Sequence, residues 1–128
     1  MANLRVGLVS PEREVWSGEA KTVVAQTTEG ALGILPGHAP VLGVLLDGSV
    51  VKIEPADGGE PIVAMVGSGF FSVADNEVSV LAEQAELGEE VDVQAAKRAL
   101  EEALEAESTD ATPERRARAR LRAAGVEA

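Results

Sequence analysis

Apolar and polar residues alternate with a period of two along the first part of the chain. In the run LRVGLVS, Leu4, Val6 and Leu8 share one face of an extended strand, and Arg5 lies on the other. Similar short runs follow, most of them separated by turn-forming segments such as LDG and ADGGEP. They are EVW, KTVVAQT, VLGVLL, SVVKIE, PIVAMV, FFSVA and EVSVLA. About 8–10 short strands with no helical pattern between them predict an antiparallel β-sandwich or barrel.

The periodicity becomes helical after Gly88. Asp92 is expected to cap a first helix, or at least to place a negative charge at its positive end. The segment Thr112-Pro113-Glu114 is a second start signal, in which threonine caps the helix and proline occupies its first position. Gly125 is a suitable C-terminal stop for this second helix.

These signals divide the chain into a β-domain and a helical appendage, which makes a β + α fold. We expect the β-domain to cover residues 1–87 and an antiparallel helical hairpin to cover residues 88–128, with helices at about 92–107 and 113–124. The apolar stripe of the hairpin is mostly alanine. Small side chains bury little apolar area, so the hairpin is expected to pack lightly and to be able to detach while the β-domain stays folded.

Composition narrows the possible chemistry. The chain has 128 residues, no cysteine, no tyrosine and a single histidine, His38. Disulfides, thiolate catalysis and the common zinc motifs are therefore excluded, no metal site is expected, and an enzyme is disfavoured. No apolar run is long enough to span a bilayer, and the N-terminus lacks the layout of a signal peptide, so we expect the protein to stay in its compartment of synthesis.

Charge is distributed unevenly. The net charge of −11 argues against nucleic acid as a partner, yet residues 113–128 carry five arginines and two acidic residues. The basic residues are Arg115, Arg116, Arg118, Arg120 and Arg122. Two interpretations are equally open: the basic helix offsets the acidic helix beside it, or it docks onto an acidic protein surface. Insertion into a bilayer is disfavoured because the apolar face is too small.

The segment GALGILPGHAP, residues 30–40, is rich in glycine and proline and contains His38. It lacks the lysine of a phosphate-binding loop and the spacing of a dinucleotide-binding turn. A lone histidine supplies one metal ligand at most, so we interpret the segment as a rigid, shaped loop that presents His38 as a surface contact. Trp16 is expected to be a core or edge plug, and the paired glutamates are expected to form a solvated helix face.

Taken together, the motifs resemble a known family. The runs GALGILPGHAP and GSGFFSVADNEVSVLAEQAE, followed by an acidic helix and an arginine-rich tail, are similar to the epsilon subunit of bacterial F-type ATP synthase, which is called delta in mitochondria. The resemblance covers essentially the whole chain. It implies a β-sandwich followed by a helical hairpin, in a non-catalytic subunit of the central stalk.

The resemblance also implies partners and roles for particular residues. Such a subunit binds the gamma subunit, the c-ring and the catalytic alpha and beta subunits, and it couples proton-driven rotation to ATP synthesis at the cytoplasmic face of the membrane. The positions Ala31, Leu35 and His38 would face the polar loops of the c-ring. The five arginines would approach an acidic segment of the beta subunits when the hairpin extends and restrains ATP hydrolysis, which favours the docking interpretation.

Two departures from the family pattern qualify these roles. Some bacterial relatives bind ATP through a motif in which an aspartate is followed three residues later by an arginine. Its counterpart here is Val91–Ala96, which keeps the aspartate as Asp92 and has Ala95 in place of the arginine. Glu86 and Asp92 remain as weak motif positions, so tight ATP binding is not expected and no cofactor is predicted. The last helix, at about 12 residues, is also short, which limits its reach to roughly 18 Å.

One alternative comes from a different class of protein. A free-standing β-sandwich with a helical lid could bind a small molecule in an apolar pocket. The aliphatic, aromatic-poor composition does not indicate such a pocket, and only 2% of the residues are aromatic.

Overall fold

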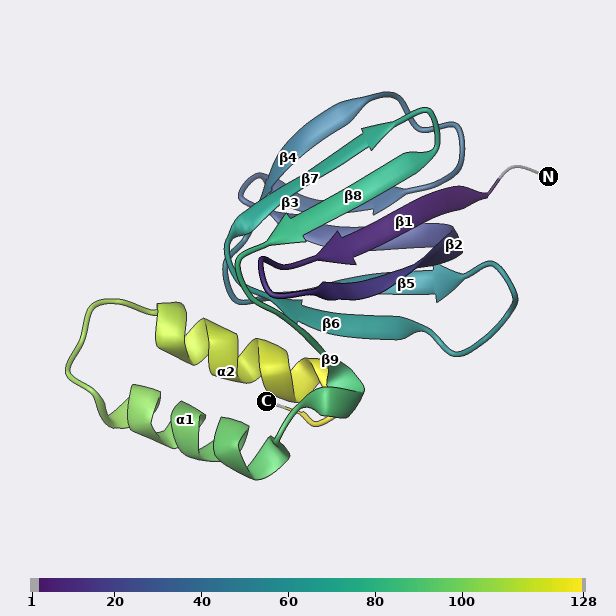
Figure 1. Ribbon diagram of the computed structural model, residues 1–128. Helices are drawn as coiled ribbons and strands as arrows, with labels where there is room; N and C mark the ends of the chain where they lie inside the picture. Colours follow the sequence, from purple (N-terminus) through teal and green to yellow (C-terminus); the bar gives the residue numbers. More distant parts are fainter. Residues whose placement is uncertain (1–2, 128) are drawn as a thin grey trace.

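The structure is a computed structural model that describes residues 3–127, and Figure 1 shows a β-domain with a pair of helices below it. In the described part of the chain the β-domain contains nine strands, within the range expected. Their bounds are β1 Leu4–Val9, β2 Glu14–Thr27, β3 Gly30–Ile34, β4 Val41–Leu45, β5 Ser49–Pro55, β6 Ile62–Val66, β7 Gly69–Ala74, β8 Glu77–Ala82 and β9 Ala85–Leu87.

The long strand β2 joins the two layers of the sandwich. Its first half pairs with β1, and its second half pairs with β5 and β3. One layer continues through β8, β7 and β4, and the other through β5, β6 and β9 (Figure 1). The expected sandwich is confirmed, with one difference from a purely antiparallel arrangement: β1 and β8 are parallel. These two strands are far apart in the chain, so no hairpin turn requires them to be antiparallel.

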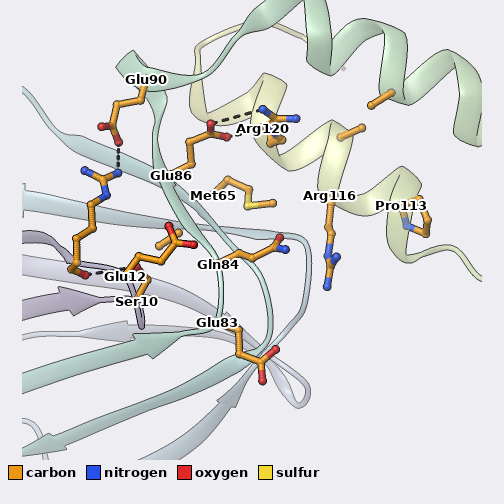
Figure 2. Close-up of a pocket in the computed structure, with 14 residues that line it drawn as sticks. Ser10, Glu12, Met65, Glu83, Gln84, Glu86, Glu90, Pro113, Arg116 and Arg120 are labelled. Carbon is orange, nitrogen blue, oxygen red and sulfur yellow. Dashed lines mark hydrogen bonds and ion pairs between the residues drawn. The ribbon is translucent and has the colours of Figure 1, made fainter.

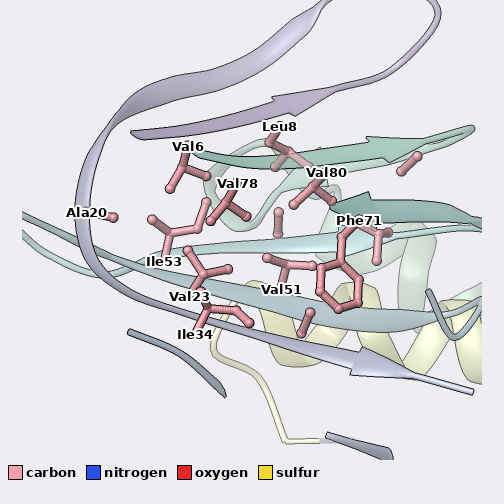
Figure 3. Close-up of a cluster of buried hydrophobic side chains, with 14 of the residues drawn as sticks. Val6, Leu8, Ala20, Val23, Ile34, Val51, Ile53, Phe71, Val78 and Val80 are labelled. Atoms are coloured by element: carbon pink, nitrogen blue, oxygen red, sulfur yellow. The ribbon is translucent and has the colours of Figure 1, made fainter. Parts of the chain in front are cut away.

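Alternation along the strands builds an aliphatic core (Figure 3). Leu4, Val6 and Leu8 are buried, as their period of two predicts. Phe71 is the largest fully buried side chain, and its ring occupies the space above Gly43, where a Cβ atom would collide with it. Trp16 is partly buried and packs against the edge of this core.

The interpretation of residues 30–40 as one loop is wrong in its first half. Gly30–Ile34 forms strand β3, which pairs with β2 from Thr27 to Val23. Gly30 adopts a φ of +121°, a conformation that suits glycine at a tight hairpin turn, so the chain reverses after Thr27 and re-enters the sheet. Only residues 35–40 form the loop.

The hairpin consists of helix α1, Val93–Glu105, and helix α2, Thr112–Ala123, preceded by a short 3-10 turn, η1, at Gly88–Glu90. Asp92 caps α1 as expected, since its Oδ1 accepts the Ala95 N–H at 3.0 Å. The expected cap of α2 is wrong. Thr112 is the first helical residue, and its N–H donates to Asp110 Oδ1 at 2.9 Å, because the preceding polar turn already supplies the acceptor.

The ends of the helices also differ slightly from the expectation. Helix α1 ends at Glu105, two residues before the expected end near residue 107. The chain then turns toward α2. Helix α2 lies against the sheet, whereas α1 packs on α2 and makes few contacts with the sandwich (Figure 1). The hairpin is therefore attached to the β-domain mainly through one of its two helices.

Candidate functional site

Helix α2 lies directly on the outer face of β5 and β6. Ala119 and Ala123 pack on Met65, with Val50 and Val63 beside them. This contact is apolar but small, because alanine contributes little area. These residues form a second, smaller hydrophobic cluster on the outer face of the sheet, separate from the main core between the two layers.

Two glycines let the helix approach this closely. A Cβ atom at Gly48 would lie 2.8 Å from the backbone nitrogen of Arg116, and a Cβ atom at Gly88 would collide with the carbonyl oxygen of Ala123. The obstacle is backbone in both cases, so no side-chain movement could relieve it. Gly48 and Gly88 therefore set the position of α2 at its two ends.

Two arginines of α2 form ion pairs with the sandwich. Arg116 binds Asp47 through two hydrogen bonds of 2.8 Å each, and Arg120 donates to Glu86 Oε1 at 2.8 Å. The guanidinium of Arg116 lowers the pKa of Asp47 below its usual value, chiefly through the side-chain hydrogen bond. We call these two contacts, Arg116–Asp47 and Arg120–Glu86, the α2 clamps.

The other arginines of α2 make weaker or neutral contacts. Arg118 pairs with Glu114 one turn earlier, and Arg115 donates to the carbonyl oxygen of Asp47 and to the Thr112 hydroxyl. Arg122 is exposed. Within residues 3–127, no arginine of α2 forms an ion pair with α1, so the acidic helix is not the partner that the intramolecular interpretation named.

A cavity of about 620 Å³ lies between one flank of the hairpin and the sandwich, and Figure 2 shows charged side chains around it. Each of its three arginines already has a carboxylate partner. Besides the α2 clamps, Arg13 binds Glu90 at 2.6 Å, a contact that lowers the pKa of Glu90 and raises that of Arg13. An anion in this cavity would therefore have to displace an existing ion pair.

The two remaining ATP-motif positions both have internal partners in this structure. Glu86 accepts from Arg120, as Figure 2 shows, and Asp92 caps α1. The structure thus does not bring them together as a pair of ligand-binding carboxylates. Among residues 3–127, no group of three or more His, Cys, Asp and Glu side chains is arranged to hold a metal ion.

The predicted c-ring-facing positions lie along β3 and the loop that follows it. Ala31 is exposed on β3, opposite Gln26 of β2, whereas Leu35 and His38 lie in the loop. The loop is held by a turn in which His38 N–H donates to the Leu35 carbonyl at 3.1 Å. Gly37 N–H also donates to Asn76 Oδ1 at 2.7 Å, which ties the loop to the turn between β7 and β8.

An apolar surface on the outer face of β4, β7 and β8 was missed by the sequence reasoning. Val44, Phe70 and Leu81 are neighbours in register across the three strands, and Leu42 lies two residues from Val44 on the same face. Their exposed fractions are 75% for Leu42, 47% for Val44, 54% for Phe70 and 53% for Leu81. We call these four residues the apolar wall.

The apolar wall has neutral polar neighbours on one side, and Glu83 lies near Phe70 and Leu81 on another. The next row across the sheet contains Ser72 and Ser79 opposite one another, with Gly7 of β1 beside Ser79. A signal for this surface was available in the sequence. The runs FF and VLGVL place apolar residues at consecutive positions, and since neighbours on a strand point to opposite faces, one of each pair must point outward.

An exposed apolar wall of this kind marks a surface where another protein docks. The fold and its surfaces therefore define a class of protein: a small β-sandwich subunit that functions within a larger assembly. The model of the family described as ATP synthase, Delta/Epsilon chain, beta-sandwich domain matches residues 3–88. The chain belongs to this family, and the resemblance inferred from its motifs is confirmed.

Relatives extend the match over the helices. The ATP synthase epsilon chain of Streptomyces coelicolor is 56% identical over 123 residues, which cover 96% of both chains. That of Rhodococcus opacus is 56% identical over 102 residues, covering 80% of this chain and 83% of the relative. Family membership makes the chain a non-catalytic subunit of the ATP synthase complex, and it decides against the free-standing small-molecule-binding sandwich.

The fold is also found in solved assemblies. A chain in the cryo-EM structure of the Euglena gracilis mitochondrial ATP synthase OSCP/F1/c-ring superposes with a TM-score of 0.73 and 23% identity, covering 94% of this chain and 76% of that one. A chain in the Tetrahymena thermophila mitochondrial ATP synthase central stalk and c-ring superposes with a TM-score of 0.57. Within residues 3–127, no helix combines the length and the hydropathy needed to cross a membrane.

Proposed function

We propose that the chain is the rotor subunit that joins the gamma subunit to the c-ring in the central stalk, and that it does so with two different surfaces. The apolar wall carries this proposal. It docks against gamma, because a folded partner with an apolar surface of its own is needed to remove these side chains from water. The loop end of the sandwich, with Ala31, Leu35 and His38, meets the polar loops of the c-ring.

The wall is suited to firm attachment. Fully burying a Leu, Val or Phe side chain is worth about 1.5–3 kcal/mol, and four such residues lie together here. A single charge within the wall would have to be buried without a partner on docking. The variant Leu81→Glu is therefore expected to lose most of its binding to gamma, and Glu54→Lys, on the outer face of the opposite layer, serves as the control.

The test is co-purification of gamma and the catalytic subunits with tagged variants, with Trp16 fluorescence confirming that the sandwich is folded. The proposal predicts that Leu81→Glu fails to retain gamma and that Glu54→Lys retains it. If Leu81→Glu retained gamma as well as the unmodified chain does, the wall would not be the docking surface.

The loop end is expected to act in coupling instead of attachment. Substituting Leu35 or His38 with Asp should uncouple proton flow from ATP synthesis and leave gamma in the complex. The hydrogen bonds donated by the backbone N–H groups of Gly37 and His38 survive these substitutions. The contact of His38 Nδ1 with the Ala39 carbonyl oxygen, at 2.7 Å, is kept in the Leu35 variant and lost in the His38 variant. Proton pumping by inverted membrane vesicles is the measurement, and unfolding of the variants would show that the loop belongs to the core architecture.

We also propose that the arginines of α2 restrain ATP hydrolysis by docking onto an acidic segment of the beta subunits. The two α2 clamps must open first, because Arg116 and Arg120 are engaged with Asp47 and Glu86 in the docked state. Deleting residues 113–128 should raise the ATPase activity of membranes. Unchanged activity would mean that α2 is purely structural.

Tight binding of ATP is not part of the proposed function. Ala95 stands where the motif arginine would be, and the arginines of the cavity in Figure 2 are all paired with carboxylates. Calorimetry on the isolated chain is expected to detect no micromolar affinity for ATP.

The working location of the subunit is the cytoplasmic face of the membrane, where it is peripheral and held by the c-ring.

A further inference from the structure

A second groove runs along the flank of α2 opposite the clamps. It has a volume of about 550 Å³ and lies between α2 and the outer face of β2 and β5. At 100° per residue, Arg115, Arg118 and Arg122 share this flank, whereas Arg116 and Arg120 point to the other side. The groove is thus separate from the cavity that contains the clamps.

The rim of this groove is basic, in a chain whose net charge is −11. It carries Lys52 of β5 together with the three arginines, and no carboxylate of the described residues lines it. Arg115 is bonded only to neutral oxygens, and Lys52 and Arg122 have no ion-pair partner within residues 3–127. Positive charge is therefore concentrated here, and among the four basic residues only Arg118 has a carboxylate partner, Glu114, within residues 3–127.

The floor of the groove is apolar. Val24, Leu46 and Val50 line it, and Val24 is 38% exposed on the outer face of β2. A small inorganic anion would satisfy the rim and leave this floor in water. A ligand with both carboxylates and aliphatic side chains would use both parts.

We propose that this groove binds an acidic amphipathic segment of a partner protein, with its Asp or Glu side chains on the rim and a Leu, Ile or Val side chain on the floor. One wall of the groove is α2 and the other is the sheet, so the groove exists only while α2 is docked. A segment bound there stabilises the docked hairpin by mass action and opposes its release. The proposal is independent of the apolar wall and of the loop end. It concerns the docked hairpin, whereas the docking of the arginines onto the beta subunits proposed above concerns the released one.

The test uses the full-length chain and a short fluorescent peptide made only of Glu and Leu, measured by anisotropy. The double substitution Lys52→Glu and Arg122→Glu removes no internal ion pair, yet it should weaken binding by about tenfold or more. The matched control, Lys97→Glu with Arg98→Glu, makes the same change of charge on exposed positions of α1 and should leave the affinity unchanged.

Hydrogen exchange of the α2 amides is the second measurement. The peptide is expected to slow their exchange in the unmodified chain and to have no effect in the double variant. Equal weakening by the control pair, or equally tight binding of a Glu and Ser peptide, of inorganic triphosphate or of phosphatidylglycerol vesicles, would overturn the proposal. Retention of gamma by the double variant separates this outcome from a failure of the rotor assignment.

Discussion

The sandwich and helix α2 are held by different kinds of contact. The sandwich has a continuous core of Leu, Ile, Val and Phe side chains on both layers. Helix α2 is held by a small buried cluster of alanines over Met65, by two close glycines and by the two partly exposed clamps. From this difference we expect the two parts to have separate stabilities, so that α2 leaves the sheet while the sandwich remains folded.

The largest effect is expected inside the core. Phe71→Ala removes the largest fully buried side chain and should lower the free energy of unfolding by about 3–5 kcal/mol. Trp16 is the only tryptophan, and it packs on this core, so its fluorescence follows the sandwich during denaturant unfolding. The adjacent Phe70→Ala is the control, because Phe70 is exposed in the isolated chain and should change stability by only about 0.5 kcal/mol. Equal losses for the two would mean that the core and wall assignments of this strand are wrong.

A smaller effect, confined to the hairpin, is expected at Gly88. Gly88→Ala places a methyl group against the Ala123 carbonyl and should destabilise the docked position of α2 by about 1–3 kcal/mol. Gly7→Ala is the matched control, since a Cβ there meets no atom within 4 Å. Faster hydrogen exchange in α2, with unchanged Trp16 fluorescence, is the expected result. If the sandwich unfolded with the helix, the two parts would form one cooperative unit.

The same contrast explains what could be predicted from the sequence. Strand periodicity, helix spacing and the Asp92 cap are local signals, and they located the sandwich and the hairpin. The β3 strand was missed because Gly30 and Gly33 suggest a loop, whereas pairing with β2 supplies the hydrogen bonds that make it a strand. Long-range pairing of this kind carries no local signature.

The functional surfaces were likewise predicted only in the part that local sequence signals carry. Helical spacing in the sequence already sets Arg116 and Arg120 apart from the other three arginines. It does not show that these two bind Asp47 and Glu86. Asp47 lies in the turn between β4 and β5, 69 residues from Arg116 in the chain, and only the fold brings them together. The apolar wall was likewise visible only once the register of β4, β7 and β8 was known.

Asp47→Asn tests the contribution of a single clamp. Both partners are partly exposed, so the lost charge-assisted contact should weaken docking of α2 by only about 1 kcal/mol. Glu77→Gln, in the more exposed pair with Arg5 at 3.6 Å, is the control and should have almost no effect. Hydrogen exchange of the α2 amides measures the effect of both variants. Equal exchange in the two would show that the Asp47–Arg116 pair does not stabilise the docked position of α2.

Acid should open the same clamp without a mutation. Because Arg116 holds the pKa of Asp47 below its ordinary value, the contribution of the clamp is fully present above that ordinary value, near 3.9. It is lost as the pH falls through the lower pKa of the docked state. The protection of the α2 amides, which is the intrinsic exchange rate at the same pH divided by their observed rate, should therefore fall in strong acid in the unmodified chain. Asp47→Asn should lack this component, and an identical acid response in the two proteins would contradict the assignment.

The smallest effect is expected at the start of α1, the helix farthest from the sandwich. Asp92→Ala removes the hydrogen bond from the Ala95 N–H, at a loss of about 0.5–1 kcal/mol of helix stability, whereas Asp92→Ser keeps a capping oxygen. Since α1 packs mainly on α2, only its first turn should fray, and both α2 and Trp16 should be unaffected. Amide exchange resolved by residue distinguishes these outcomes. Loosening of α2 in the alanine variant would show that the two helices dock as one body, and release of the hairpin would then begin at α1, before either clamp opens.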